Sequence, residues 1–379
     1  MNEKKRVVHL TTVHHPHDPR IYHKECKSLK KAGFDVYLIA KETEAGMDSE
    51  SGIKHIPIID YTSRLERMTK GAWMLYKQAK KLNADVYHFH DPELLPVGWL
   101  LKNSRNHVIY DIHEDYITSM LQKEYLPKTI RKFVAKAYKK VEQFFTKKME
   151  LILAEKYYKD IYPDGDCVLN YPMVNTAFLE HQREGEIEDK LIYTGNVTDV
   201  RGAFLHAKLP LIDKKITMNY IGKCSTEFAV EIYRIAKNQS DRIYIKGVDQ
   251  YIPKEEIEQA YLEHNWLAGV AIFPKTEHYM KKELTKFFEY MNAGIPIICS
   301  DFPVWKRFIE MYQCGITVNP HNDQEIKDAL DYLRNHPDIA KQMGENGKKA
   351  VQEQLNWGVE EEKLITIYHR ILNEQDEMK

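Results

Sequence analysis

Several features that often decide the class of a protein are missing from this sequence of 379 residues. It has only five cysteines, and no two of them form a C-x-x-C pair. Such an odd, dispersed set argues against a disulfide framework and against a structural zinc site, and it is typical of a reducing compartment. The formal net charge of −1 gives no overall attraction to nucleic acid.

Long apolar runs are also missing. No stretch approaches the ~18 consecutive apolar residues that a transmembrane helix needs. The first residues, MNEKKRVVHLTTVHH, contain a short apolar run interrupted by His9, which predicts a first strand and not a signal peptide. With 43% apolar and 29% charged residues, the chain is expected to be a soluble globular protein of the cytoplasm.

The sequence does contain a regular alternation of strand-like and helix-like segments. Apolar, β-branched runs occur in the first half at 6–13, 35–40, 84–90, 107–112, 151–154 and 167–169. They recur in the second half at 190–195, 216–222, 242–247, 268–274, 295–300 and 315–319. Helical patterns such as 25–31 and 68–82 lie between most of them. This alternation predicts an α/β protein with two doubly wound, Rossmann-like domains that face each other across a cleft.

The boundary between the two domains is expected at Asn170-Tyr171-Pro172, because proline ends the preceding strand and stiffens the linker. We therefore predict a first domain over 1–170 and a second domain over 171–355. The tail 357–372 has apolar residues on one helical face, which predicts a final amphipathic helix.

The most informative segment is 283–303, ELTKFFEYMNAGIPIICSDFP. A helical pattern ends at Ala293-Gly294, and Pro296 then begins a short apolar strand. Glu289 lies among apolar neighbours, where a carboxylate is costly without a partner. One interpretation is that it binds a pair of ribose hydroxyls. The other is that it faces water or pairs with Lys286, which lies on the same helical face.

This segment resembles the C-terminal signature of the glycosyl transferases group 1 family, whose members are retaining enzymes of the GT-B fold. In the family the pattern P-x-K-L-F-E-Y-M-A-A-G-x-P-V-I-x-S holds the nucleotide of a sugar donor. The resemblance covers nearly the whole chain and implies the GT-B fold for it. It also implies that the last helix, 356–379, crosses back onto the first domain.

A second segment that resembles the family is the glycine loop at 193–202. The family commonly has G-R-x(4)-K-G here, and both cations meet phosphates. In this chain Asn196 replaces the first cation, and Arg201 replaces the lysine with a guanidinium that suits phosphate. An arginine that is merely solvated is the alternative. The resemblance implies a donor site with Arg201 and Lys286 on the diphosphate and Glu289 on the ribose. The remaining donor-side candidates are Gly195, Asn196, Gly202, Lys281, Glu283, Leu284 and Thr285.

Two of these positions depart from the family pattern. Many relatives have a glutamate eight residues before the ribose-binding one, and that glutamate is thought to face the transferred sugar. Lys281 occupies this position here, and Leu284 stands where a proline is common. We therefore expect the sugar to be held differently from the way those relatives hold it.

In the first domain, His113 ends a predicted strand, and the resemblance implies that it approaches the donor sugar and its phosphate. Together with Arg201 and Lys286 it forms the predicted catalytic set. The loop 13–21 has no glycine, unlike most phosphate loops, and resembles an H-P-x-D-x-R-I variant of the family. Asp18 is also expected to cap a helix that begins near Pro19. The candidates for the acceptor or phosphate side are Asp18, Arg20, His90 and Glu114, although His90 also fits an ordinary polar residue at a strand end.

No metal and no other cofactor is expected. A metal site made of His88, His90 and His113 with Asp91 or Glu114 has suitable ligand types, and His88 and His90 lie on one face of a strand. Spacing of this kind is common by chance, so we favour a site without metal.

The segment 123–149 is basic and amphipathic. Apolar residues at helical spacing alternate with nine cations, which are Lys123, Lys128, Arg131, Lys132, Lys136, Lys139, Lys140, Lys147 and Lys148. This pattern favours peripheral contact with an anionic membrane surface and would suit a lipid-linked acceptor. A core-facing helix with a solvated basic face is the alternative.

The sequence thus predicts a metal-independent, retaining glycosyltransferase of the hexosyltransferase type, active in polysaccharide biosynthesis. It would move a sugar from a nucleoside diphosphate donor, UDP-linked before GDP-linked, to a glycan or lipid-linked acceptor. Two alternatives remain open. One is a nucleotide-sugar 2-epimerase of the same fold. The other is a non-catalytic, glycosyltransferase-like subunit, which the residues Asn196 and Lys281 keep in consideration.

Overall fold

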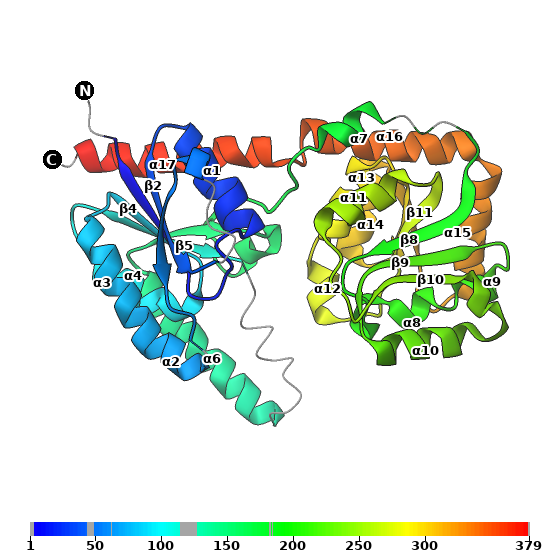
Figure 1. Cartoon of the computed structure of the whole chain (residues 1–379), viewed down its shortest axis with the longest axis horizontal. Coiled ribbons are helices and arrows are strands. Elements are labelled where there is room, and N and C mark those ends of the chain that lie inside the picture. Colours follow the sequence, from blue (N-terminus) through cyan, green and yellow to red (C-terminus); the bar gives the residue numbers. More distant parts are fainter. Residues whose placement is uncertain are drawn as a thin grey trace. The chain divides into compact units, whose positions relative to one another are not determined.

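The computed structural model of the chain describes residues 4–43, 49–61, 63–113, 127–181, 183 and 185–377. The chain divides into two compact units, Met1–Asn170 with Trp357–Lys379, and Tyr171–Asn356. Each unit is built on a parallel sheet flanked by helices (Figure 1). The predicted α/β class with two doubly wound sheets is therefore confirmed.

The first unit contains a sheet of seven strands in the order β3-β2-β1-β4-β5-β6-β7, and every neighbouring pair is parallel. The order reverses between β1 and β4, which is the switch point where polar groups and ligands gather in such sheets. The strands are β1 Arg6–Leu10, β2 Asp35–Lys41, β3 Lys54–Ile58, β4 Val86–Phe89, β5 His107–Ile112, β6 Glu150–Leu153 and β7 Asp166–Cys167.

Helices cover both faces of this sheet. A wide helical turn over Pro19–Cys26 continues into α1, and on the same face the apolar side of α17 joins the core. Helices α3 and α4 and part of α6 pack on the opposite face. The helices of the unit are α1 Lys27–Lys31, α2 Arg64–Glu66, α3 Ala72–Leu82, α4 Leu95–Leu101, α6 Lys128–Thr146 and α17 Trp357–Glu377, with short helical turns at Ser49–Ser51, Arg67–Gly71, Pro92–Leu94 and Lys156–Asp160.

Strand β3 was not predicted from the sequence. Its sequence KHIPI contains Pro57, which removes a backbone donor, and it has little of the apolar pattern of a central strand. The strand lies at the edge of the sheet, pairing only with β2, where a missing donor is tolerated.

The last helix, α17, belongs to the first unit although it follows the second in sequence. Its buried carboxylate Glu360 accepts a hydrogen bond from the backbone N–H of Leu169 at 2.8 Å. The indole N–H of Trp357 donates to Ser28 Oγ at 3.0 Å. Among the described residues, no helix is both long enough and apolar enough to cross a bilayer.

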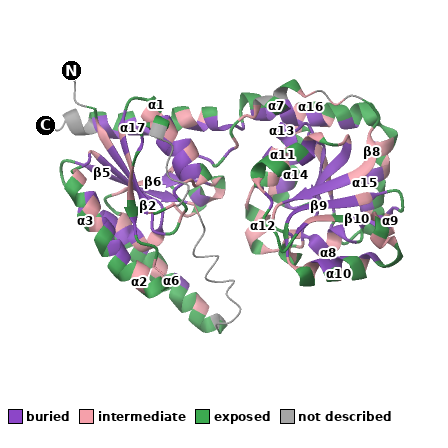
Figure 2. Ribbon diagram, viewed as in Figure 1, coloured by how far each residue is buried: buried purple, intermediate pink, exposed green. Residues whose placement is uncertain are grey.

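The second unit repeats the design with a parallel sheet in the order β10-β9-β8-β11-β12-β13. Figure 2 shows the strands of both sheets as mostly buried. The strands are β8 Glu188–Thr194, β9 Thr217–Cys224, β10 Ile243–Val248, β11 Trp266–Ala271, β12 Ile297–Ser300 and β13 Gly315–Val318. The helices are α7 Thr176–Glu180, α8 Ala203–His206, α9 Leu209–Ile212, α10 Thr226–Ala236, α11 Lys254–Leu262, α12 Glu277–Lys281, α13 Thr285–Asn292, α14 Pro303–Tyr312, α15 Asp323–Asn335 and α16 Pro337–Glu353, with helical turns at Asp199–Arg201 and Lys237–Arg242.

Candidate functional site

The glycine loop of the second unit follows β8 and ends in the short turn that carries Arg201. Gly195 and Gly202 both have positive φ angles, +86° and +78°. A Cβ atom at Gly202 would lie 2.0 Å from the carbonyl oxygen of Ile272, so no other residue fits there. The two glycines therefore let the chain turn tightly at the carboxyl end of β8, and this turn determines where the backbone of Arg201 lies.

Helix α13 supplies the second part of the site. Its apolar side chains Phe287, Phe288 and Met291 are buried, whereas Lys286 and Glu289 are partly exposed on another face. The helix ends at Asn292, Gly294 follows with a φ of +66°, and β12 begins at Ile297. The predicted helix, glycine and strand over this segment are therefore confirmed.

The glycine loop and α13 meet at Lys286. The ammonium of Lys286 lies 4.9 Å from the centre of the Tyr193 ring and 3.0 Å from the place of a Cβ atom on Gly195. Arg201 lies beside the Tyr193 hydroxyl and close enough to Lys286 to act on its charge. Two cations that are 85 residues apart in sequence (286 − 201) thus share one site.

Glu289 is held by a tyrosine that the sequence did not single out. The hydroxyl of Tyr261, on α11, donates to Glu289 Oε2 at 2.9 Å, and Thr194 Oγ1 lies 2.7 Å from the same hydroxyl. Because the tyrosine proton is donated to Glu289, Thr194 donates to the tyrosine oxygen. Glu289 also raises the pKa of Lys286, so the interpretation of a local pair stays open beside that of a ribose contact. No motif around Tyr261 marks it in the sequence.

The cations of this site are poorly compensated. Burial lowers the pKa of Lys286 to about 8, the nearby Arg201 acts in the same direction, and Glu289 acts against both. Burial stabilises the neutral amine because a charged amine loses its hydration. An anion bound between Arg201 and Lys286 would restore that lost stabilisation, so the arrangement suits a phosphate group.

The other donor-side candidates surround this centre less tightly. Asn196 is exposed, and its backbone carbonyl accepts from the Tyr193 hydroxyl at 2.9 Å. Leu284 is buried and precedes the first turn of α13, and Thr285 begins that helix. Lys281 is exposed at the end of α12, and Glu283 is partly buried between the two helices.

In the first unit, the predicted residues belong to a polar network at the carboxyl ends of β1, β4 and β5. Arg20 makes two bonds of 2.9 Å to the carboxylate of Asp111, through Nε and Nη2. His113 Nε2 lies 2.5 Å from Asp111 Oδ2, and His90 Nδ1 lies 3.2 Å from the same His113 nitrogen. Glu25 approaches Arg20 Nε at 3.0 Å.

Burial separates the members of this network. Arg20 is 3% exposed and His90 is 1% exposed. Charge pairing explains the burial of Arg20, because two buried carboxylates lie beside its guanidinium. The expected place of both residues on the acceptor or phosphate side stays a prediction. His113 is partly exposed.

The remaining candidates of the first unit are Asp18 and Glu114. Asp18 Oδ1 accepts from the backbone N–H groups of Arg20 at 2.8 Å and Ile21 at 3.0 Å. The predicted helix cap is therefore confirmed. Glu114 lies outside the described residues.

The three fully buried histidines His9, His88 and His90 are neutral at pH 7. Burial lowers the pKa of His90 to about 4, and it holds the pKa values of His9 and His88 well below the ordinary range. Burial and the neighbouring Asp111 raise the pKa of Glu25. His9 and Glu25 were not identified from the sequence. His9 is paired with His88 on the neighbouring strand, so the presence of histidine on two predicted neighbouring strands could have marked His9, whereas no local pattern marks Glu25.

Comparison with known proteins relates both units to sugar-transferring enzymes. Residues 249–350 match the glycosyl transferases group 1 family, and residues 19–155 match Glycosyltransferase Family 4. Both matched models describe glycosyltransferases, so the chain is a glycosyltransferase, as predicted. No curated protein matches the sequence.

Solved structures show that this glycosyltransferase has the GT-B fold, which confirms the predicted architecture. The sucrose-phosphate synthase of Thermosynechococcus elongatus is 17% identical, with a TM-score of 0.71, over 98% of this chain and 100% of that one. Anabaena Alr3699/HepE in complex with UDP and glucose is 9% identical, with a TM-score of 0.69, over 97% and 100%. WaaG, a glycosyltransferase involved in lipopolysaccharide biosynthesis, is 11% identical, with a TM-score of 0.66, over 95% and 98%.

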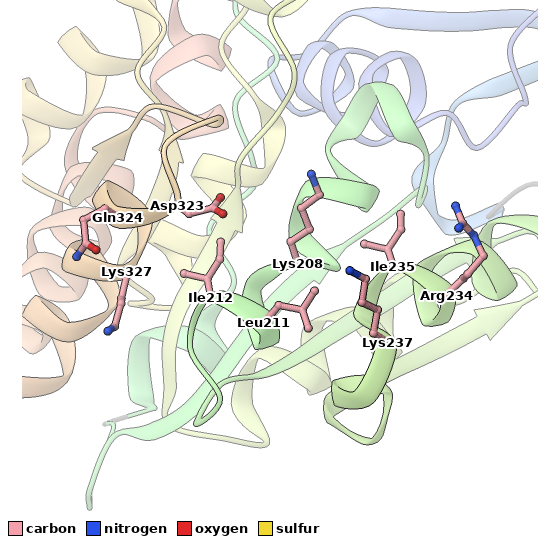
Figure 3. Close-up of a pocket in the computed structure, with 9 residues that line it drawn as sticks. All are labelled: Lys208, Leu211, Ile212, Arg234, Ile235, Lys237, Asp323, Gln324 and Lys327. Atoms are coloured by element: carbon pink, nitrogen blue, oxygen red, sulfur yellow. The ribbon is translucent and has the colours of Figure 1, made fainter.

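A separate pocket of the glycosyltransferase, shown in Figure 3, lies elsewhere in the second unit. It is formed by α9, the end of α10 with its following turn, and the start of α15. Four cations line it, Lys208, Arg234, Lys237 and Lys327, with Asp323 as the carboxylate. None of the predicted donor-site residues is among the residues that line this pocket.

The lowered pKa of Lys286 is measurable in the free enzyme. After methylation of the amines with ¹³C, the NMR signal of Lys286 should titrate with a midpoint near 8, below the ordinary lysine value of about 10.4. The α-amino group, which ordinarily titrates at about 7.7–8.0, gives a second signal in this range that no lysine substitution removes. The positive charge of Lys286 is fully present below this pH and is lost as the pH rises through it. The Lys286 signal should disappear in Lys286→Arg and remain in Lys281→Arg, which removes an exposed lysine. A full set of lysine signals that titrate near the ordinary value would contradict the buried site.

Proposed function

We propose that the protein is a retaining, metal-independent glycosyltransferase that takes its sugar from a nucleoside diphosphate donor. The observation that carries this proposal is the meeting of Lys286 with the glycine loop next to Arg201. Two under-compensated cations at the carboxyl end of a parallel sheet suit the diphosphate of such a donor. A UDP-sugar is favoured, because a structure of similar fold is a complex with UDP and glucose.

Each donor-site residue has a separate role in the proposed reaction. Arg201 and Lys286 stabilise the negative charge that develops on the diphosphate as the bond to the sugar breaks. Glu289, held by Tyr261, binds the ribose hydroxyls and fixes the nucleotide. The acceptor hydroxyl attacks from the face that the diphosphate leaves, and the departing phosphate takes its proton. This course retains the configuration at the sugar and needs neither a side-chain base nor a metal.

In the first unit, the proposal keeps His113 as the residue that approaches the donor sugar. Unlike Arg20 and His90, it is partly exposed, and its ring is oriented by the buried Asp111. No observation favours a nucleotide-sugar 2-epimerase or a non-catalytic subunit over this function.

The acceptor is proposed to be a glycan or lipid-linked molecule used in polysaccharide biosynthesis at the cytoplasmic face of a membrane. Helix α6 supports a location at anionic lipid. Its apolar residues Ile130, Phe133, Val141 and Phe144 recur at helical spacing, and they are 47%, 75%, 50% and 57% exposed. Exposed lysines flank them, at 132, 136, 139 and 140. An exposed apolar stripe between cations is the pattern of a helix that lies on a membrane surface.

The donor proposal predicts which nucleotide stabilises the enzyme. At 100 times its dissociation constant, UDP should add about 2.7 kcal/mol to the free energy of unfolding, which is readable as a thermal shift. At the same concentration, GDP, ADP and dTDP should add less. Arg201→Ala or Glu289→Ala should raise the dissociation constant of UDP about 10- to 100-fold, because each removes a charge-assisted contact.

The control for these variants is Arg234→Ala, which removes a cation from the pocket of Figure 3 and leaves the donor site intact. UDP should bind this variant like the wild type. Loss of binding in Arg234→Ala with full binding in Arg201→Ala would move the nucleotide to the other pocket and overturn the proposal.

The membrane proposal predicts binding to vesicles. The wild type should sediment with vesicles of phosphatidylglycerol and should remain in solution with vesicles of phosphatidylcholine. The double variant Phe133→Ser/Phe144→Ser should lose this binding, because it removes the two most exposed aromatic groups of α6. Tyr251→Ser, which changes an aromatic residue that is 74% exposed in the second unit, should bind as the wild type does. Equal sedimentation of the double variant and the wild type would show that α6 is not the contact.

A further inference from the structure

The first unit contains a group of buried ligand-type side chains that the proposed transfer reaction does not use. His9 comes from β1, His88 from β4, His90 follows β4 directly, and Glu25 comes from the helical turn over Pro19–Cys26. All four are at most 1% exposed. One nitrogen from each histidine and one oxygen from Glu25 lie within 4.8 Å of one another.

The centre of this group is Glu25 Oε2. It lies 3.8 Å from His9 Nδ1, 3.9 Å from His88 Nε2 and 3.9 Å from His90 Nε2. His9 Nδ1 and His90 Nε2 are 3.0 Å apart. In a tetrahedral zinc site with bonds of about 2.0–2.1 Å, neighbouring ligand atoms are about 3.3 Å apart. The three distances to Glu25 Oε2 exceed this value by about 0.5–0.6 Å, and no pair of ligand atoms is more than 4.8 Å apart, so small side-chain shifts would bring the four atoms to zinc-binding distance.

Two of these atoms have no other use in the part of the chain that the structure describes. Glu25 Oε2 and His88 Nε2 are fully buried and lack a hydrogen-bond partner there. Buried polar atoms without a partner are rare and costly, and an ion or a water molecule is their usual explanation. A single water molecule has two protons to donate, whereas the group presents three imidazoles and a carboxylate. A cation satisfies all of them at once.

The surroundings of the group are those of a closed metal site. His88 Nδ1 lies 2.8 Å from the hydroxyl of Tyr368 on α17, and His90 Nδ1 lies 3.3 Å from Asp111 Oδ2. Partners of this kind behind the ligating rings fix their orientation and tautomer. The far oxygen of Glu25 lies 3.0 Å from Arg20 Nε, which leaves Oε2 directed at the rings.

A neighbouring set of ligand-type residues, His90 with Asp111 and His113, is less suitable. Arg20 already neutralises Asp111 through two hydrogen bonds. Asp91, which the sequence offered as a ligand, belongs to neither group. Its Oδ2 accepts from the backbone N–H of Thr12 at 2.6 Å and from Thr11 Oγ1 at 2.9 Å.

We propose that His9, Glu25, His88 and His90 bind one zinc ion that stabilises the first unit. The ion is structural, because the four ligands are buried and fill a tetrahedral shell without an open position. It takes no part in the transfer of sugar. The proposal departs from the expectation of no metal. The set weighed from the sequence shared His88 and His90 with this site but had His113 in place of His9 and lacked Glu25.

The test uses the full chain without a histidine tag, expressed with zinc in the medium and purified without chelator. Elemental analysis should find about one zinc ion per chain in the wild type. Glu25→Gln and His88→Gln should lose it, because each removes a ligand while keeping side-chain size similar. The matched control is His107→Gln, which replaces another buried histidine of the same sheet, at the start of β5. It should keep its zinc.

A second measurement decides the matter if the variants fail to fold. Wild-type protein refolded with cobalt should show the strong visible bands of a four-coordinate ion, and its melting temperature should exceed that of protein refolded without metal. Absence of both zinc in the purified protein and bands after refolding would overturn the proposal and leave water as the occupant. Zinc retained in both Glu25→Gln and His88→Gln would also overturn it.

Discussion

The donor site depends on the placing of two positive charges side by side in a partly dehydrated part of the second unit. Arg201 and Lys286 repel each other, and burial adds to the cost of the charge on Lys286. The fold tolerates this cost because helix α13 is anchored by its buried aromatic face and the loop by glycines with positive φ angles. A bound anion would relieve this strain, and for this reason we propose that the arrangement which costs stability provides affinity for a diphosphate.

The charges of the first unit are arranged in the opposite way. There the charges are deeply buried but paired, since Arg20 lies between the carboxylates of Asp111 and Glu25. Pairing makes this network a part of the core, with His113 as the member that reaches the surface. The two units have similar sheets, yet one presents uncompensated charge to a ligand and the other keeps compensated charge inside. Whether the buried charges are compensated therefore distinguishes a binding site from a structural network more clearly than the types of residue do.

The sequence predicted the sheets and the segment 283–303 well, because apolar periodicity and glycine positions are local properties. It missed β3, whose proline is acceptable only at a sheet edge. It missed Tyr261, since a tyrosine that holds Glu289 from another helix leaves no local pattern. The burial of Arg20 was not predicted for a related reason: it depends on Asp111, which is 91 residues away. Whether such a polar side chain is buried depends on partners that are distant in sequence, and motifs defined by local spacing do not include these partners.

The central claim is that the donor is bound by Arg201, Lys286 and Glu289. A crystal structure of the full chain with a bound UDP-sugar would test it most directly. The account predicts diphosphate oxygens within hydrogen-bond distance of the Arg201 guanidinium and the Lys286 ammonium, and ribose hydroxyls on the carboxylate of Glu289. A nucleotide bound away from all three side chains, or with its ribose turned from Glu289, would contradict it.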